Sequence, residues 1–134
     1  MIEQGLIAKL NSSPAVQAIT ANGGWYEQLP TDAPMPNWSY MIVFANPVYG
    51  LQALSGLVSS MFQFDFYSEN DNGVGTVNLG KAFKSVLDGF SGTLTDPDST
   101  VVNSAFWVGE HDYPLDPARR TWRRMAEYRV LYWV

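Results

Sequence analysis

The one histidine of the chain lies between two carboxylates, a pattern that acid/base catalysis or metal binding could use. Glu110, His111 and Asp112 are consecutive. Histidine titrates near neutral pH and is a common metal ligand. In an extended segment, however, adjacent side chains point to opposite faces, and the nearby Pro114 favours a loop. We therefore interpret Glu110–Pro117 as a solvated loop and predict no catalytic or metal-binding role for His111.

Two other segments are only superficially similar to ligand sites. Ser68 to Gly73 begins like a calcium loop, but Leu79 stands six residues beyond the glycine, where a bidentate Glu would be needed. Gly73 and Gly75 precede a helix without the Lys of a phosphate-binding loop. We predict a turn here, and no cofactor.

Two carboxylate pairs have the residue types of a glycosidase site. Glu69 with Asp71, and Asp96 with Asp98, both lie in turn sequence. Neither pair has the apolar neighbours that would raise a carboxyl pKa for general-acid chemistry. We interpret both pairs as surface charge.

The most unusual local feature is a basic segment near the end of the chain. Four of the eight Lys and Arg residues fall within six positions: Arg119, Arg120, Arg123 and Arg124, around Trp122. Such a segment suits nucleic-acid contact, an ion-pairing seam against an acidic neighbour, or protection of a strand edge. In a strand, Arg120, Trp122 and Arg124 share one face and Arg119 and Arg123 the other, and a seam between subunits can use both faces. We predict that these five residues form a subunit or partner interface, with the arginines meeting carboxylates of a neighbour.

The composition is that of one domain, residues 1–134, with an unusually apolar surface. Charged residues make up 16% of the chain, below the roughly 25% that is typical, and aromatic residues make up 14%. Aromatic side chains are enriched both in β cores and at interface hot spots. Some apolar surface is therefore expected to meet a partner.

The charge and the residues that are absent exclude several classes of protein. The net charge of −5 argues against broad adhesion to nucleic acid, which needs many phosphate-neutralising side chains. The absence of cysteine excludes disulfides, thiolate nucleophiles and Cys-ligated zinc. The start of the chain does not have the pattern of a signal peptide, and no apolar run is long enough to cross a bilayer. We expect an intracellular protein that does not bind membranes.

The periodicity of apolar residues predicts an α+β fold, with a single sheet of about five mostly antiparallel strands and two amphipathic helices packed on it. The expected helices are residues 1–10, followed by a further turn at 15–19 after Ser13-Pro14, and residues 79–90. The expected strands are 25–29, 38–45 (ended by Asn46-Pro47), 57–68, 92–95, 101–108 and 121–134. Phe62, Phe64 and Phe66 alternate on one face and give the clearest strand. The proline-rich segment, residues 30–36, is expected to be an exposed contact loop through Pro34, Met35 and Pro36.

In order and spacing, these segments resemble the tail terminator, or tail completion, proteins of long-tailed bacteriophages. The resemblance rests on the opening helix up to Ile19, Trp25-Tyr26 with the proline-rich segment, the strands 38–42 and 62–68, the helix ending Val86-Leu87-Asp88-Gly89, and the closing strand 128–132. It covers nearly the whole chain. The segments 47–60 and 113–117 depart from it.

The resemblance implies a structural virion protein in the tail or neck, assembled in the host cytoplasm. Such proteins form rings, usually hexamers, that cap the tail tube and join it to the head, with tail tube and head-completion proteins as partners. DNA passes through the middle, and no active site is implied. A channel lined with carboxylates would repel phosphates and leave DNA free to move. We predict that the acidic residues Asp65, Glu69, Asp71, Asp96 and Asp98 face the channel.

Three alternatives remain open from the sequence. The nearest is a head-closure ring or another neck protein. The second is a small-molecule-binding or enzymatic α+β barrel whose aromatic residues line a cavity. The third is a nucleic-acid-binding module that uses the basic segment at 119–124.

Overall fold

The computed structural model describes residues 2–20, 23–30, 32–49, 54–97 and 99–134. The elements in chain order are α1 (Ile2–Ser12), α2 (Pro14–Gln17), β1 (Trp25–Tyr26), β2 (Asn37–Tyr49), β3 (Leu54–Glu69), α3 (Val74–Leu87), β4 (Gly92–Thr93), β5 (Val101–Asp116) and β6 (Thr121–Trp133). The predicted α+β class is confirmed.

The strands form one mixed sheet in the order β1-β2-β3-β6-β5-β4. Among the described strands, only the β1–β2 pairing is parallel. The described chain has six strands and three helices, whereas the prediction was about five strands and two helices. The difference lies in short elements: β1 and β4 have two residues each, and α2 is a four-residue turn of helix that starts at Pro14.

Two predicted strand ends are wrong, for the same physical reason. β2 continues through Asn46 and Pro47 to Tyr49, and β5 continues through the segment Glu110–Pro117, predicted to be a loop, as far as Asp116. Both continuations lie on edge strands, because β1 pairs with β2 only at residues 39–40 and β4 with β5 only at 101–102. Proline is tolerated there, since its missing N–H removes no ladder hydrogen bond.

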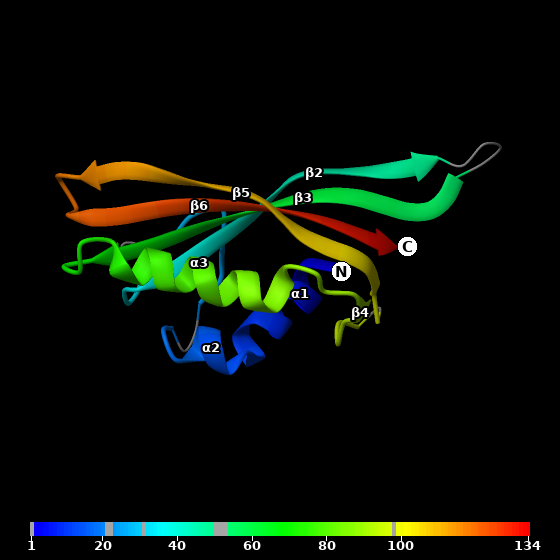
Figure 1. Cartoon of the computed structure of the whole chain (residues 1–134), viewed down its shortest axis with the longest axis horizontal. Coiled ribbons are helices and arrows are strands. Elements are labelled where there is room, and N and C mark those ends of the chain that lie inside the picture. Colours follow the sequence, from blue (N-terminus) through cyan, green and yellow to red (C-terminus); the bar gives the residue numbers. More distant parts are fainter. Residues whose placement is uncertain (1, 21–22, 31, 50–53, 98) are drawn as a thin grey trace.

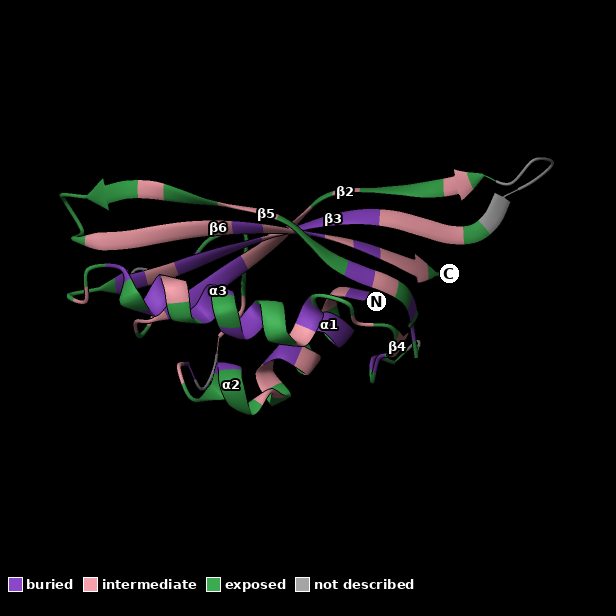
Figure 2. Ribbon diagram, viewed as in Figure 1, coloured by how far each residue is buried: buried purple, intermediate pink, exposed green. Residues whose placement is uncertain are grey.

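All three helices lie on one face of the sheet, and the core fills the space between them (Figure 1). The predicted aromatic face of β3, Phe62, Phe64 and Phe66, is fully buried in this layer, as Figure 2 shows by colour. Phe83 of α3 packs edge-on against Trp38, Phe64 and Phe66, with ring centroids 4.7–5.2 Å apart. These contacts hold α3 to the sheet.

No described helix covers the opposite face of the sheet (Figure 1). Cross-strand register places Gln63, Asp65 and Tyr67 of β3 on this face, beside Met125 and Arg123 of β6. The β2–β3 hairpin and the β5–β6 turn extend from the two ends of the sheet in opposite directions (Figure 1). One face and both ends are therefore available for contact.

The turn that resembles half a calcium loop is held by its own aspartate. Asp71 accepts hydrogen bonds from the Ser68 hydroxyl at 2.9 Å, the Gly73 N–H at 3.0 Å and the Gly75 N–H at 2.7 Å. The last two N–H groups belong to the start of α3, where backbone donors have no helical partner. The predicted turn is confirmed, with Asp71 satisfying these donors.

We expect Asp71→Ala to lower the free energy of unfolding by about 1–2 kcal/mol, the usual effect of removing a helix-capping carboxylate. Urea denaturation measures the change. The neighbouring Glu69 is exposed, so Glu69→Ala is the matched control and should change stability by less than about 0.5 kcal/mol. Equal losses in the two variants would show that Asp71 does not act as a cap.

Candidate protein-interaction groove

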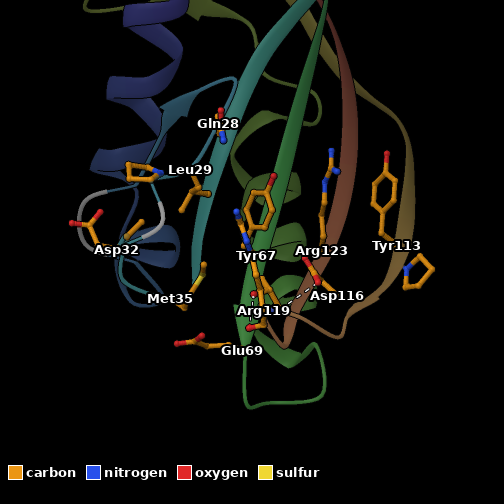
Figure 3. A pocket seen from close by; sticks show the side chains of 14 residues that line it. Gln28, Leu29, Asp32, Met35, Tyr67, Glu69, Tyr113, Asp116, Arg119 and Arg123 are labelled. Carbon is orange, nitrogen blue, oxygen red and sulfur yellow. Dashed lines mark hydrogen bonds between the residues drawn. The ribbon is translucent and has the colours of Figure 1, made fainter.

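A groove of about 770 Å³ lies at the end of the molecule that carries the β5–β6 turn, and we call it the interaction groove. Figure 3 shows Asp32 and Met35 on one side, Tyr113 and Asp116 on the other, and Tyr67 between them. Its lining comes from residues before and within the proline-rich segment (Gln28, Leu29, Pro30, Asp32, Ala33, Met35), from β3 (Tyr67, Glu69), from β5 (Tyr113, Pro114, Asp116), and from the β5–β6 turn and β6 (Arg119, Thr121, Arg123).

The groove brings together two segments that the sequence predicted separately as contact sites. Met35 of the proline-rich segment lines it together with Arg119 and Arg123 of the basic segment. Pro34 is exposed, and Pro36 is half-buried beside Gly75 at the start of α3. Met35 is therefore the part of the proline-rich prediction that lies in the groove.

Arg123 is fixed in the groove wall by a carboxylate of its own chain. Its Nε and one terminal nitrogen donate to Oδ1 of Asp65 at 3.2 and 3.1 Å, and its guanidinium lies 4.2 Å from the ring centroid of Tyr113. Burial alone would lower the pKa of Arg123, but Asp65 and the nearby tyrosines raise it, so the guanidinium stays charged.

The interface role predicted for Arg123 and the channel-facing role predicted for Asp65 stay predictions. In the single chain these two side chains pair with each other, and the Asp65 side chain is 6% exposed. The cause is register: Asp65 pairs with Met125 and Tyr67 pairs with Arg123, so Asp65 and Arg123 are diagonal neighbours on one face.

Arg124 points to the opposite, helix-bearing face and is also paired within the chain. Its nitrogens contact Oε2 of Glu110 at 2.6 and 2.7 Å and Oδ1 of Asp112 at 3.3 Å. Trp122 faces the same way and lies against Gly73 at the start of α3. Both side chains thus have contacts within the chain, and their predicted interface role stays a prediction.

The Glu110-His111-Asp112 trio does not converge, because alternation separates its members. Glu110 and Asp112 turn toward Arg124, whereas His111 pairs with Met125 on the other face and packs edge-on against Tyr113, 4.9 Å between ring centroids. The loop prediction was wrong, but the predicted division between the two faces is confirmed.

Arg119 and Arg120 lie in the turn just before β6, so the strand alternation considered for the arginines does not apply to these two. Both are exposed, and Arg120 adopts a left-handed backbone with φ of 54°. Asp116 holds the turn by accepting from the N–H groups of Ala118 and Arg119 at 3.0 and 3.3 Å. Among the described residues, neither arginine side chain forms an ion pair. These two arginines keep the charge that a partner could meet.

The acidic residues predicted to face a channel do not form one surface. Glu69 is exposed and lines the groove, whereas Asp71 caps α3. Asp96 is buried beside Gly5 of α1, and Asp98 lies outside the described residues. Of the four described candidates, Glu69 is the exposed one that lines the groove, and the channel-facing role of the set stays a prediction.

Asp96 fastens the turn that follows β4. Its carboxylate accepts from the Thr100 hydroxyl at 2.5 Å and from the Thr100 N–H at 2.7 Å. The hydroxyl bond is the strongest influence, and together with the N–H bond it lowers the pKa of Asp96 below its ordinary value of 3.8, against the opposing effect of burial. Asp96 is therefore ionised and bonded at neutral pH.

We expect Asp96→Asn to be less stable than the wild type at pH 7 and to approach it in acid. A carboxyl whose pKa is lower in the folded state stabilises fully above the unfolded value of 3.8, and loses that contribution as the pH falls through the folded value. Urea denaturation at pH 7 and near pH 3 measures the gap between the two proteins. A gap that does not change with pH would contradict this role.

Sequence reasoning missed Tyr67 and Tyr113 as groove residues. Tyr113 was hidden because its segment was interpreted as a loop. Its two-residue spacing from His111 was the available signal, since residues two apart on a strand share a face.

Comparisons with known proteins support the fold. No protein-family model and no curated protein matches the chain. A solved chain from the virion of a native gene transfer agent particle has the same fold, with a TM-score of 0.78 over 99% of this chain and 95% of that chain. The identity is 10%, so the likeness is one of fold.

Within the part of the chain that the structure describes, no group of three or more His, Asp and Glu side chains is placed to hold a metal ion. Nor is any described helix long and apolar enough to cross a membrane.

Proposed function

We propose that this chain is a structural virion protein that forms a ring, terminates a tail tube and joins the tail to the head, with DNA passing through the centre. The observation that carries the proposal is the fold shared with a chain of a gene transfer agent virion over almost the full length of both chains. The order of sequence segments, which resembles tail terminator proteins, supports the same role.

The distribution of free surface suits self-assembly. A bare sheet face lies between two different projecting ends, the β2–β3 hairpin and the β5–β6 turn. Contacts between unlike ends are heterologous, and they form a ring when the rotation closes. The proposed ring has six subunits, and its partners are tail tube and head-completion proteins.

We propose a structural rather than a catalytic role, because the residues that suggested chemistry hold the fold together. Glu110 and Asp112 bind Arg124, Asp71 caps α3 and Asp96 fastens a turn. The barrel alternative is disfavoured by the strand order, which runs from β1 at one edge to β4 at the other without closing. The nucleic-acid alternative is disfavoured because Arg123 and Arg124 already form ion pairs with carboxylates of their own chain.

Native mass spectrometry of the purified protein tests the ring. Six subunits of 14.9 kDa give 6 × 14.9, about 89 kDa. A closed species of that mass, which appears as a ring in negative-stain images, is the expected result. A protein that stays monomeric at every concentration, also in the presence of tail tubes, would overturn the proposal.

A further inference from the structure

The sheet face that no described helix covers has an apolar area at its centre, and we call this side of the sheet the open face. Cross-strand register assigns to it Met41 and Phe44 of β2, Met61 of β3, Met125 and Leu131 of β6, and Phe106 of β5. Met61 is buried, Phe106 is exposed and the other four are half-buried. Methionine and aromatic side chains are enriched at interfaces, so the open face has the composition of a contact surface.

Two charged side chains lie within this apolar area. Glu127 and Arg129 are two residues apart on β6 and therefore point to the same side of the sheet. Among the described residues, neither of them forms an ion pair. Arg129 contacts only the Ser59 hydroxyl, at 3.4 Å, and the ring of Phe44, 5.6 Å from its centroid. An uncharged partner would bury both charges without compensation, so the partner has to place a cation opposite Glu127 and an anion opposite Arg129.

A second copy of this chain supplies that arrangement. Consider two open faces stacked on each other, with a twofold axis between them that runs across the strands level with Tyr128. The axis reverses the direction of β6, so each Glu127 lies opposite Arg129 of the other copy.

The area available also suits such a contact. The central strands β2, β3, β6 and β5 lie side by side, and residues 125–133 of β6 span the apolar part. At about 4.8 Å between strands and about 3.4 Å per residue, this area is about 600 Å² per copy. Specific interfaces bury about 600–1,000 Å² per partner, so the open face reaches the lower end of that range.

We propose that the open face of one copy packs against the open face of a second copy about this twofold axis, with reciprocal ion pairs between Glu127 and Arg129. The contact is isologous, because both copies use the same surface. It goes beyond the proposed ring, whose subunits meet through their projecting ends. The pairing joins two free chains or two rings, and in either state each chain has one partner across the open face.

Cysteine cross-linking of the full-length protein measures this pairing, because the natural chain has no cysteine. Gly109 of β5 pairs with Glu127, and a side chain added at Gly109 meets no atom within 4 Å. With about 10 Å between stacked sheets, the axis places the two Cα atoms of residue 109 about 12 Å apart, within reach of a flexible bismaleimide. The control is Lys81→Cys, at an exposed position of α3. We expect Gly109→Cys to give covalent dimer at roughly tenfold the yield of the control, or more.

Charge reversal in the Gly109→Cys background tests the position of the axis. Glu127→Arg places Arg opposite Arg, and Arg129→Glu places Glu opposite Glu, so each variant alone should lose roughly tenfold or more of the cross-linked dimer. An equimolar mixture of the two variants restores both ion pairs between unlike copies. The mixture should therefore recover the cross-linked dimer, whereas Lys81→Glu in the same background should change nothing.

The outcomes separate the pairing from the ring. Recovery in the mixture supports the pairing and cannot result from a folding defect, because mixing does not repair either variant. Cross-linked dimers in a protein that forms no ring would support the pairing and overturn the ring. A ring whose Gly109→Cys copies give no more dimer than Lys81→Cys would overturn the pairing and leave the ring standing. Dimer yields that do not respond to either charge reversal would also overturn the pairing.

Discussion

Replacing Phe83 with alanine is expected to lower the free energy of unfolding by about 3–5 kcal/mol, the range for removing a large aromatic ring from a packed core. Phe83 is fully buried and is the largest of the buried side chains that α3 presents to the sheet. Its ring contacts Trp38 of β2 and Phe64 and Phe66 of β3, so the variant leaves a cavity bounded by two strands and a helix.

Chemical denaturation at concentrations where the protein is monomeric measures this loss. Phe106→Ala is the matched control, because Phe106 lies on β5 with 42% of its surface exposed. Phe106→Ala should lower the free energy of unfolding by less than about 1 kcal/mol, since it removes little buried apolar area. A Phe83→Ala variant as stable as Phe106→Ala would show that α3 is not packed on the sheet as described.

Reversing the charge of Arg124 is expected to destabilise the single chain, by roughly 2–4 kcal/mol. Arg124→Glu replaces the partner of Glu110 and Asp112 with a third carboxylate. Removing one partner of a fully buried ion pair lowers the free energy of unfolding by about 3–5 kcal/mol. The side chains here are partly exposed, 23% for Arg124 and 15% for Glu110, which reduces that loss. Repulsion between the new Glu and the two carboxylates increases it. The variant should fail to assemble because it is poorly folded.

Arg120→Glu is the matched control, because it reverses a charge in the same basic segment without removing an ion pair of the folded chain. Arg120 lies in an exposed turn, so its reversal should change the stability of the chain by less than about 0.5 kcal/mol. Denaturation and sedimentation of the two variants give the comparison. If Arg124→Glu folds as stably as Arg120→Glu, the Glu110–Arg124 pair contributes little to stability, and the predicted role of Arg124 at an interface between subunits gains support.

Local patterns predicted the elements that local forces determine. The alternation of Phe62, Phe64 and Phe66 and the helical spacing of Leu79, Phe83 and Leu87 both placed their apolar faces correctly, because burial of one face fixes the period. The turn chemistry at Asp71 was likewise local. The predictions at Pro47 and Pro114 were wrong, because both prolines were interpreted as strand breaks. Both lie on edge strands, where the N–H that proline lacks is not needed for a hydrogen bond to a neighbouring strand.

Ion pairing could not be predicted, because it depends on register between strands distant in sequence. Arg123 meets Asp65 across 58 positions, and that contact exists only once β3 and β6 are aligned. The same holds for the interaction groove. Met35 and Arg119 were both predicted contact residues, but nothing in the sequence alone places them on one groove. Composition predicted contact surface only as residue types, not as a shape.

The basic segment divides into two parts. Arg119 and Arg120 retain exposed charge, whereas Arg123 and Arg124 form ion pairs within the chain. The predicted interface role of all four arginines stays a prediction, and the two exposed turn arginines are the ones whose charge a partner could meet directly.

Cryo-electron microscopy of intact particles that contain this protein tests the central proposal most directly. The expected density is a six-fold ring at the junction of tail tube and head, with one copy of this fold per subunit and a central channel wide enough for DNA. A particle in which the chain lies elsewhere, or is present as isolated copies that do not encircle a channel, would contradict the proposal.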